Sequence, residues 1–140
     1  EILAAPKNDY IKNFVRDIDR SKVLQAKNIM FKPSALVSVK DGLKIAIKEM
    51  EQAGISSIFV VDNDRRLEGL VTIDHCIKGL KENKKLRDLL IQDFHTTDPE
   101  VYIHELIPIA TASKYPIAVV DEDKKLLGII VRVSVLSSLV

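Results

Sequence analysis

The side chains with the clearest binding chemistry stand at the ends of short apolar runs in the second half of the chain. Arg132 has a guanidinium group, which makes paired hydrogen bonds to phosphate oxygens. Tyr115 has a ring that can stack on a purine while its hydroxyl stays polar. Ile130 and Val131 offer an apolar shelf beside them. Two interpretations stay open here: these residues hold a ligand, or Arg132 is solvated and Tyr115 covers the edge of the core.

Thr72 and Asp74 occupy the matching place in the first half of the chain. Asp74 stands where a helix N-cap is expected, a role worth about 1 kcal/mol. Thr72 ends a predicted strand, and its hydroxyl can bond to the local backbone. Each of these residues is therefore either purely structural or both structural and a ligand contact. His75 is expected to be an exposed residue of the first helical turn, although its ordinary pKa of about 6.5 allows a response to pH.

Paired carboxylates occur twice, as Asp62 with Asp64 and as Asp121 with Asp123. Both pairs lie in short polar stretches between two strands, where Asp satisfies its own backbone, so we interpret them as turn residues. The sequence has no Ser/His/acid grouping, no Gly-x4-Gly-Lys phosphate loop and no Cys/His metal spacing. It predicts neither an enzyme nor a metal site.

An internal repeat organises these residues. The run 58–71 matches the run 117–130 without a gap, and Gly69 and Gly128 are 59 residues apart. Each copy reads as an apolar strand, an acidic turn, a cationic pair and a return strand. Gly69, inside the return strand, indicates that another backbone or a ligand approaches closely. A fixed period of this length predicts two copies of one supersecondary unit, neither of which buries its apolar face alone.

The flanking patterns complete each unit. We expect first strands over 35–39 and 94–97. Asp41 is expected to cap a helix that Ala53 and Gly54 close, and its equivalent is expected over 102–113. Further helices are expected from Asp74 to about Glu82 and over 133–139. Pro108 lies inside the predicted 102–113 helix, so that helix should start late or bend.

Each unit is therefore β-α-β-β-α. The predicted fold class is α/β (α+β), with two such units packed sheet to sheet with pseudo-two-fold symmetry. The strand ends then face each other across a cleft, the usual place for a ligand in open α/β arrangements.

Composition sets the remaining limits. The chain has 140 residues, a net charge of +1 and 46% apolar residues, so no global field favours nucleic acid. A lone Cys76 excludes an internal disulfide and suits a reducing compartment. Residues 1–23 are expected to form a lead-in helix with an apolar stripe of Tyr10, Phe14 and Ile18. The chain lacks an initiator Met, so we expect it to be a piece of a longer protein.

These motifs together resemble a tandem CBS-domain module, also called a Bateman module. The resemblance is carried by the stretches 28–30, 54–62, 69–72 with Asp74, and 116–128. It implies a CBS repeat over 24–85 and a second over 86–140. The stretches 1–15 and 17–24 look like the junction that follows the ATPase core in quaternary-amine ABC importers.

The resemblance implies a function for the whole chain. It would be a cytoplasmic regulatory module on the ATP-binding subunit of an importer of glycine betaine, carnitine, choline or proline, at the cytoplasmic face of the plasma membrane. Its implied ligand is an adenine nucleotide: cyclic di-AMP, AMP or ATP. Its implied partners are a second copy in a homodimer, the ATPase core of its own chain and the membrane subunit of the transporter.

The family's binding residues can be placed one by one. In many such modules a hydroxyl residue three positions after the glycine meets phosphate, and an Asp six positions after it meets the ribose. Thr72 holds the hydroxyl place, whereas Asp74 lies at plus five and His75 at plus six. In the second copy Val131 and Ser134 occupy the two places, so the ribose clamp is absent there.

Two other functions compete with the nucleotide sensor. One is a ligand-free sensor of ionic strength, in which the Lys78–Arg87 cationic strip contacts anionic lipid at low salt. The simpler interpretation of that strip is a solvated linker between the repeats. The other function is a scaffold that only holds two ATPase subunits together.

Overall fold

The first of two matching units comprises β1 (Val37–Ser38), α3 (Leu43–Ala53), β2 (Ser57–Val61), β3 (Leu67–Thr72) and α4 (Ile73–Lys81). The second comprises β4 (Thr96–Thr97), α5 (Ile103–Ala112), β5 (Ile117–Val120), β6 (Leu126–Ile130) and α6 (Arg132–Ser138). The computed structural model describes residues 22–139, so the predicted lead-in helix with its Tyr10, Phe14 and Ile18 stripe lies outside the described residues. The β-α-β-β-α order predicted for both units is confirmed.

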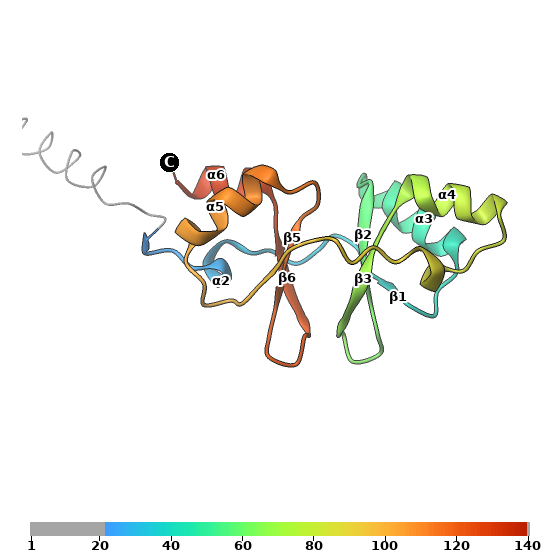
Figure 1. Ribbon diagram of the computed structural model, residues 1–140, viewed down its shortest axis with the longest axis horizontal. Coiled ribbons are helices and arrows are strands. Elements are labelled where there is room, and N and C mark those ends of the chain that lie inside the picture. The colour runs from blue at the N-terminus through green and yellow to red at the C-terminus, as the bar shows by residue number, and fades with distance from the viewer. Residues whose placement is uncertain (1–21, 140) are drawn as a thin grey trace, which may run out of the picture.

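The two sheets have the same topology and the same irregularity. In each, the central strand pairs in parallel with the first strand and antiparallel with the third. The register places Val60 opposite Gly69 and Val119 opposite Gly128, and it shifts at the next residue in both sheets. The helices lie at the outer ends of the molecule and the sheets meet in the middle (Figure 1).

The hairpin tips use their carboxylates to fix the turn. Asp62 Oδ1 accepts hydrogen bonds from the backbone N–H groups of Asp64 and Arg66, both at 2.8 Å. In the second hairpin Asp121 Oδ1 accepts the equivalent pair at 2.9 Å. Arg65 and Lys124, at the same turn position, have φ angles of 64° and 66°. These contacts confirm the interpretation of the first Asp of each pair as a turn residue.

The two tips also bind each other, and the bonds are related by the pseudo-two-fold axis. Leu67 N–H donates to the Lys124 carbonyl and Leu126 N–H donates to the Arg65 carbonyl, both at 2.9 Å. Because each pair is the other shifted by the repeat period, the contact is symmetric. Figure 1 shows the tips side by side at the bottom of the view.

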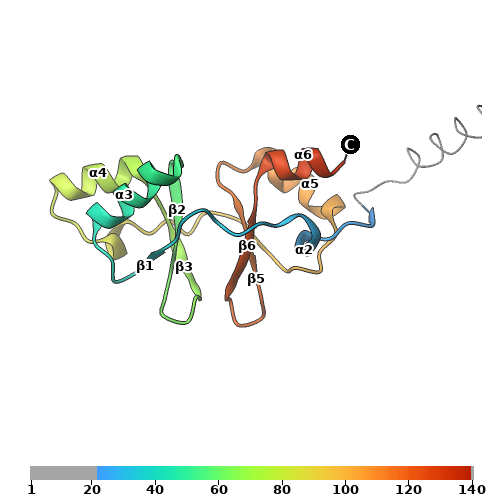
Figure 2. The ribbon, with the colours of Figure 1, turned by 180° about the vertical axis from the view of Figure 1, so that it is seen from behind.

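The segments that precede the two units are exchanged between them. Phe31 forms an antiparallel bridge with Ile129 of the second unit, and Ile91 forms one with Leu70 of the first. The short helix α2 (Ala26–Ile29) contributes to the core of the second unit, and the 3-10 helix η2 (Leu86–Leu89) to that of the first. Both views show α2 beside α5 and α6 (Figures 1 and 2). Neither unit is therefore complete without residues from the other half of the sequence.

A third apolar cluster joins the sheets. Phe59 packs edge-on against Phe94, with ring centroids 5.3 Å apart. The buried members of the cluster come from β2, β3, β5 and β6: Phe59, Val61, Leu70, Ala118, Leu126 and Ile129. Burying this surface is what holds the units face to face, as the repeat predicted.

Some local predictions were wrong. The first strands span two residues each, shorter than 35–39 and 94–97, because only Val37–Ser38 pair with β2 and only Thr96–Thr97 pair with β5. Asp41 does not cap α3: Gly42 holds the N-cap position, and Asp41 Oδ2 accepts a hydrogen bond from Ser38 N–H at 2.8 Å. The predicted helix end is confirmed, since Gly54 closes α3 with a φ of 69°.

Helix α5 does not start late despite its proline. It begins at Ile103, so Pro108 lies well inside it and leaves the backbone without one N–H. Burial of the apolar face offsets this loss, because Ile103, Leu106 and Ala110 are all at most 4% exposed.

Candidate functional site

A groove runs between the two units where the strand ends face each other. It encloses a cavity of about 350 Å³. One wall is the segment before β1 and the start of β2; the other consists of second-unit residues: Lys114, Pro116, Ile129 and Val131. The sequence predicted a cleft at this position, and the walls come from both units.

A second cavity of about 340 Å³ adjoins the first, and Lys114, Pro116 and Val131 line both. It lies between the end of α5, the start of β5 and the β6–α6 junction. Four of the six predicted site residues line it: Tyr115, Ile130, Val131 and Arg132. The structure thus brings together an aromatic ring, apolar side chains and a cation, as the ligand interpretation requires.

Arg132 is held in place by the helix opposite. Its Nε donates to the Ala110 carbonyl at 3.3 Å and its Nη2 donates to the Thr111 carbonyl at 3.0 Å. Both carbonyls belong to the last turn of α5. A cation is stabilised there because the C-terminal end of a helix carries a partial negative charge. A guanidinium has about five N–H donors, so roughly three remain for a ligand. Arg132 is therefore not simply solvated: it is an oriented cation at the rim of a cavity.

Tyr115 is half-buried and packs against the apolar cluster between the sheets. Ser113 Oγ donates to the Tyr115 carbonyl at 2.8 Å, which fixes the backbone just before β5. Covering the core edge and facing a ligand are compatible in this position, because the ring lies at the boundary of both. Ile130 is fully buried in the core of the second unit and forms part of the cavity lining from the core side.

Thr72 and Asp74 are placed differently from these four. Thr72 is the N-cap of α4, and its Oγ1 accepts a hydrogen bond from His75 N–H at 3.2 Å. The prediction that Asp74 is the N-cap was wrong, because α4 begins at Ile73 and Asp74 lies exposed in its first turn. A carboxylate there still favours the positive end of the helix dipole. Neither residue lines the two cavities, although Thr72 pairs with Ser57 of the groove wall.

Sequence reasoning missed two parts of the groove. One is the segment before β1, where Phe31, Pro33 and Ser34 line the cavity. The other is Lys114, an exposed cation shared by both cavities. Lys114 stands next to Tyr115 in sequence, a signal that could have found it. Nothing in the sequence indicated that the 31–34 segment crosses to the other unit.

Within residues 22–139, no group of three or more His, Cys, Asp and Glu side chains is arranged to hold a metal ion. Across the same residues, no helix has the length and apolar character needed to cross a membrane.

Comparison with known proteins agrees with this architecture. The family model described as "CBS domain" matches residues 26–82 and again residues 86–140. The chain belongs to the CBS-domain family. The two units described above are its CBS repeats, and the resemblance inferred from the sequence is confirmed.

Similar proteins come from osmolyte transport. The chain is 44% identical over 140 residues to the glycine betaine/carnitine transport ATP-binding protein GbuA of Listeria monocytogenes, covering 99% of the chain and 35% of that relative. It is 37% identical over 139 residues to the glycine betaine transport ATP-binding protein OpuAA of Bacillus subtilis, covering 99% and 33%. The chain therefore spans about a third of the length of these curated relatives.

A solved structure shares the arrangement of the CBS pair. Staphylococcus aureus OpuCA superposes with a TM-score of 0.73 at 27% identity, covering 79% of this chain and 94% of that one. The mixed α/β architecture with two three-stranded sheets is thus that of known CBS pairs.

Proposed function

We propose that this CBS pair is the regulatory part of the ATP-binding subunit of an ABC importer for glycine betaine or a related osmolyte, and that it senses an adenine nucleotide such as cyclic di-AMP. The observation that carries the proposal is the pair of adjoining cavities: Val131 lines both, and Tyr115 and Arg132 line the one beside α5. The printed functions of GbuA and OpuAA supply the transporter context.

The chemistry of the cavities fits a purine nucleotide. An aromatic ring and an apolar shelf suit a base, and an oriented guanidinium with Lys114 beside it suits a phosphate. Each cavity, at about 340–350 Å³, lies at the lower end of the range for small-molecule sites. A two-fold symmetric dinucleotide would use one such site on each of two copies. Thr72 and Asp74 are proposed to contact the ligand from the first repeat, because Thr72 pairs with the groove residue Ser57.

A homodimer is part of this proposal. Exposed apolar side chains lie on the outer helices of both repeats: Ile45, Ile77, Leu80, Val133 and Leu136. Such faces suit association with a second copy. A ligand bound between copies would regulate transport only if it favours one arrangement of the two ATPase cores, which are the proposed partners together with the membrane subunit at the cytoplasmic face.

Calorimetric titration of the chain with cyclic di-AMP, AMP and ATP tests the proposal. We expect Tyr115→Ala to weaken cyclic di-AMP binding at least about tenfold, since base–aromatic stacking is worth about 1–3 kcal/mol. Tyr102→Ala is the matched control, because Tyr102 is 44% exposed and lies outside both cavities. Thr72→Val and Asp74→Asn test the contacts from the first repeat. No heat with any of the three nucleotides, or equal loss in both tyrosine variants, would refute the assignment.

A further inference from the structure

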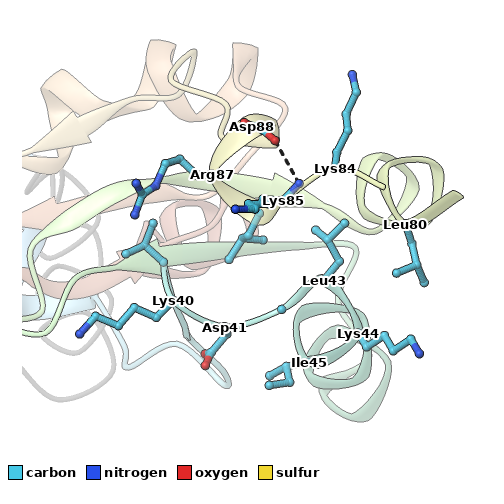
Figure 3. A pocket seen from close by; sticks show the side chains of 13 residues that line it. Lys40, Asp41, Leu43, Lys44, Ile45, Leu80, Lys84, Lys85, Arg87 and Asp88 are labelled. Carbon is cyan, nitrogen blue, oxygen red and sulfur yellow. Dashed lines mark hydrogen bonds between the residues drawn. The ribbon is translucent and has the colours of Figure 1, made fainter. Parts of the chain in front are cut away.

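A larger cavity lies at the outer side of the first repeat, away from the groove. Its volume is about 820 Å³. Its walls are the loop leading into α3, the end of α4 and the turn of η2 (Figure 3). The groove between the repeats shares no lining residue with it.

Positive charge dominates this cavity. Five cations line it: Lys40, Lys44, Lys84, Lys85 and Arg87. Lys84 Nζ lies 3.6 Å from Glu82 Oε1. Within residues 22–139, the other four cations have no carboxylate at ion-pair distance. The cations come from the loop before α3, from α3 itself and from the segment that leads into and begins η2. Folding brings these separate stretches of sequence together.

The two carboxylates in the wall are already engaged with backbone groups. Asp41 accepts a hydrogen bond from Ser38 N–H at 2.8 Å, and Asp88 accepts one from Lys85 N–H at 3.1 Å. Figure 3 draws the second of these bonds as a dashed line. Both acids therefore stabilise turns, and the lining stays net positive, with five cations against two carboxylates.

The floor of the cavity is apolar. Leu43 and Leu86 are buried at its base, and Val39 completes that surface. Ile45 and Leu80, which are 48% and 40% exposed, stand in the wall. A cationic wall above an apolar base suits an anion that carries an apolar or planar body, rather than a simple counterion.

We infer that this cavity is a second binding site, for a soluble phosphate-bearing small molecule with an apolar or planar body. Three cations of the Lys78–Arg87 strip, Lys84, Lys85 and Arg87, line this hollow together with Lys40 and Lys44. A hollow of this size matches a nucleotide-sized ligand better than a flat bilayer surface. Lys and Arg supply the hydrogen-bond donors that phosphate oxygens accept. A Cβ added at Gly42, which lines the cavity, would meet no atom within 4 Å beyond its chain neighbours, so the backbone there is open.

The test follows the backbone amide resonances of the isotope-labelled chain while ATP is added at low salt. We expect shifts at residues 40–45 and 84–88 that saturate, and that persist in the Tyr115→Ala variant, which isolates this site from the groove. The Lys44→Gln/Arg87→Gln double variant should bind about tenfold more weakly at this site, as expected for two exposed charge contacts. Raising the salt concentration should weaken binding further.

The control is the Lys48→Gln/Lys81→Gln double variant, which removes the same charge from α3 and α4 outside the cavity lining. It should retain the wild-type affinity. Equal loss in both double variants, or shifts confined to the groove, would overturn the inference. So would binding to phosphatidylglycerol vesicles in cosedimentation without any response to ATP.

Discussion

Removing the Asp62 carboxylate should loosen the contact between the two repeats. Asp62 Oδ1 accepts two backbone hydrogen bonds of 2.8 Å, and the turn that they fix presents Arg65 and Leu67 to the opposite hairpin. At a net 0.5–1.5 kcal/mol per hydrogen bond, with solvent screening at the half-buried tip, Asp62→Ala should cost about 1–2 kcal/mol. The midpoint of thermal unfolding should fall by roughly 3–6 °C.

The repeat provides matched comparisons for this prediction. Asp121→Ala should cost about as much as Asp62→Ala, because Asp121 makes the same two bonds. Asp123→Ala changes charge in the same turn, but only the backbone N–H of Asp123 takes part in the turn bonds, so it should be nearly neutral. The double Asp62→Ala/Asp121→Ala variant should lose less than the sum, because the tips share the Leu67–Lys124 and Leu126–Arg65 bonds.

The free energies of unfolding of these variants are measured by urea titration. Circular dichroism follows the transition, because the chain has no Trp whose fluorescence could report it. An Asp121→Ala variant as stable as Asp123→Ala would refute the role given to the carboxylates. Strict additivity of the double variant would refute the coupling between the tips.

Three further predictions concern the cores. Met50→Ala, in the fully buried core of the first repeat, should lower the free energy of unfolding by about 2–5 kcal/mol in urea titrations. Gly69→Ala and Gly128→Ala should each cost about 1–2 kcal/mol in the same titrations, because the added Cβ would lie 3.1 Å from Leu90 Cβ in the first repeat and 3.1 Å from Met30 Cβ in the second. Two alanine variants as stable as the wild type would contradict this close packing. Burial raises the pKa of the Cys76 thiol to about 11, so only about 0.1% of it is thiolate at pH 8. A thiol reagent should therefore react with the native chain far more slowly than with the urea-unfolded chain. Because the thiol ionises at lower pH when unfolded, Cys76 should also lower stability as the pH rises from about 9 towards 11, an effect absent in Cys76→Ala.

The sequence by itself determined the duplicated unit and its chemistry. The 59-residue period, the alternation of apolar runs with Asp-rich turns, and the glycines opposite the central strands are local signals. They express short-range rules of turn and strand formation, so they predicted the hairpins, the β-α-β-β-α order and the closure of α3 at Gly54. The group around Tyr115 and Arg132 was also readable, because β5 and β6 pair and bring those residues to one end of the sheet.

Only the tertiary structure decided how the two units complete each other. Residues 26–31 pack on the second unit and residues 86–91 pack on the first. The sequence does not predict this exchange, because both repeats present similar apolar faces on which either segment could pack. The same limit explains Asp74 and Asp41, since moving a helix start by one residue changes which side chain caps it. The cations of the cavity in the first repeat, spread over 40–44 and 84–87, line one cavity only because packing of α3, α4 and η2 brings distant residues together.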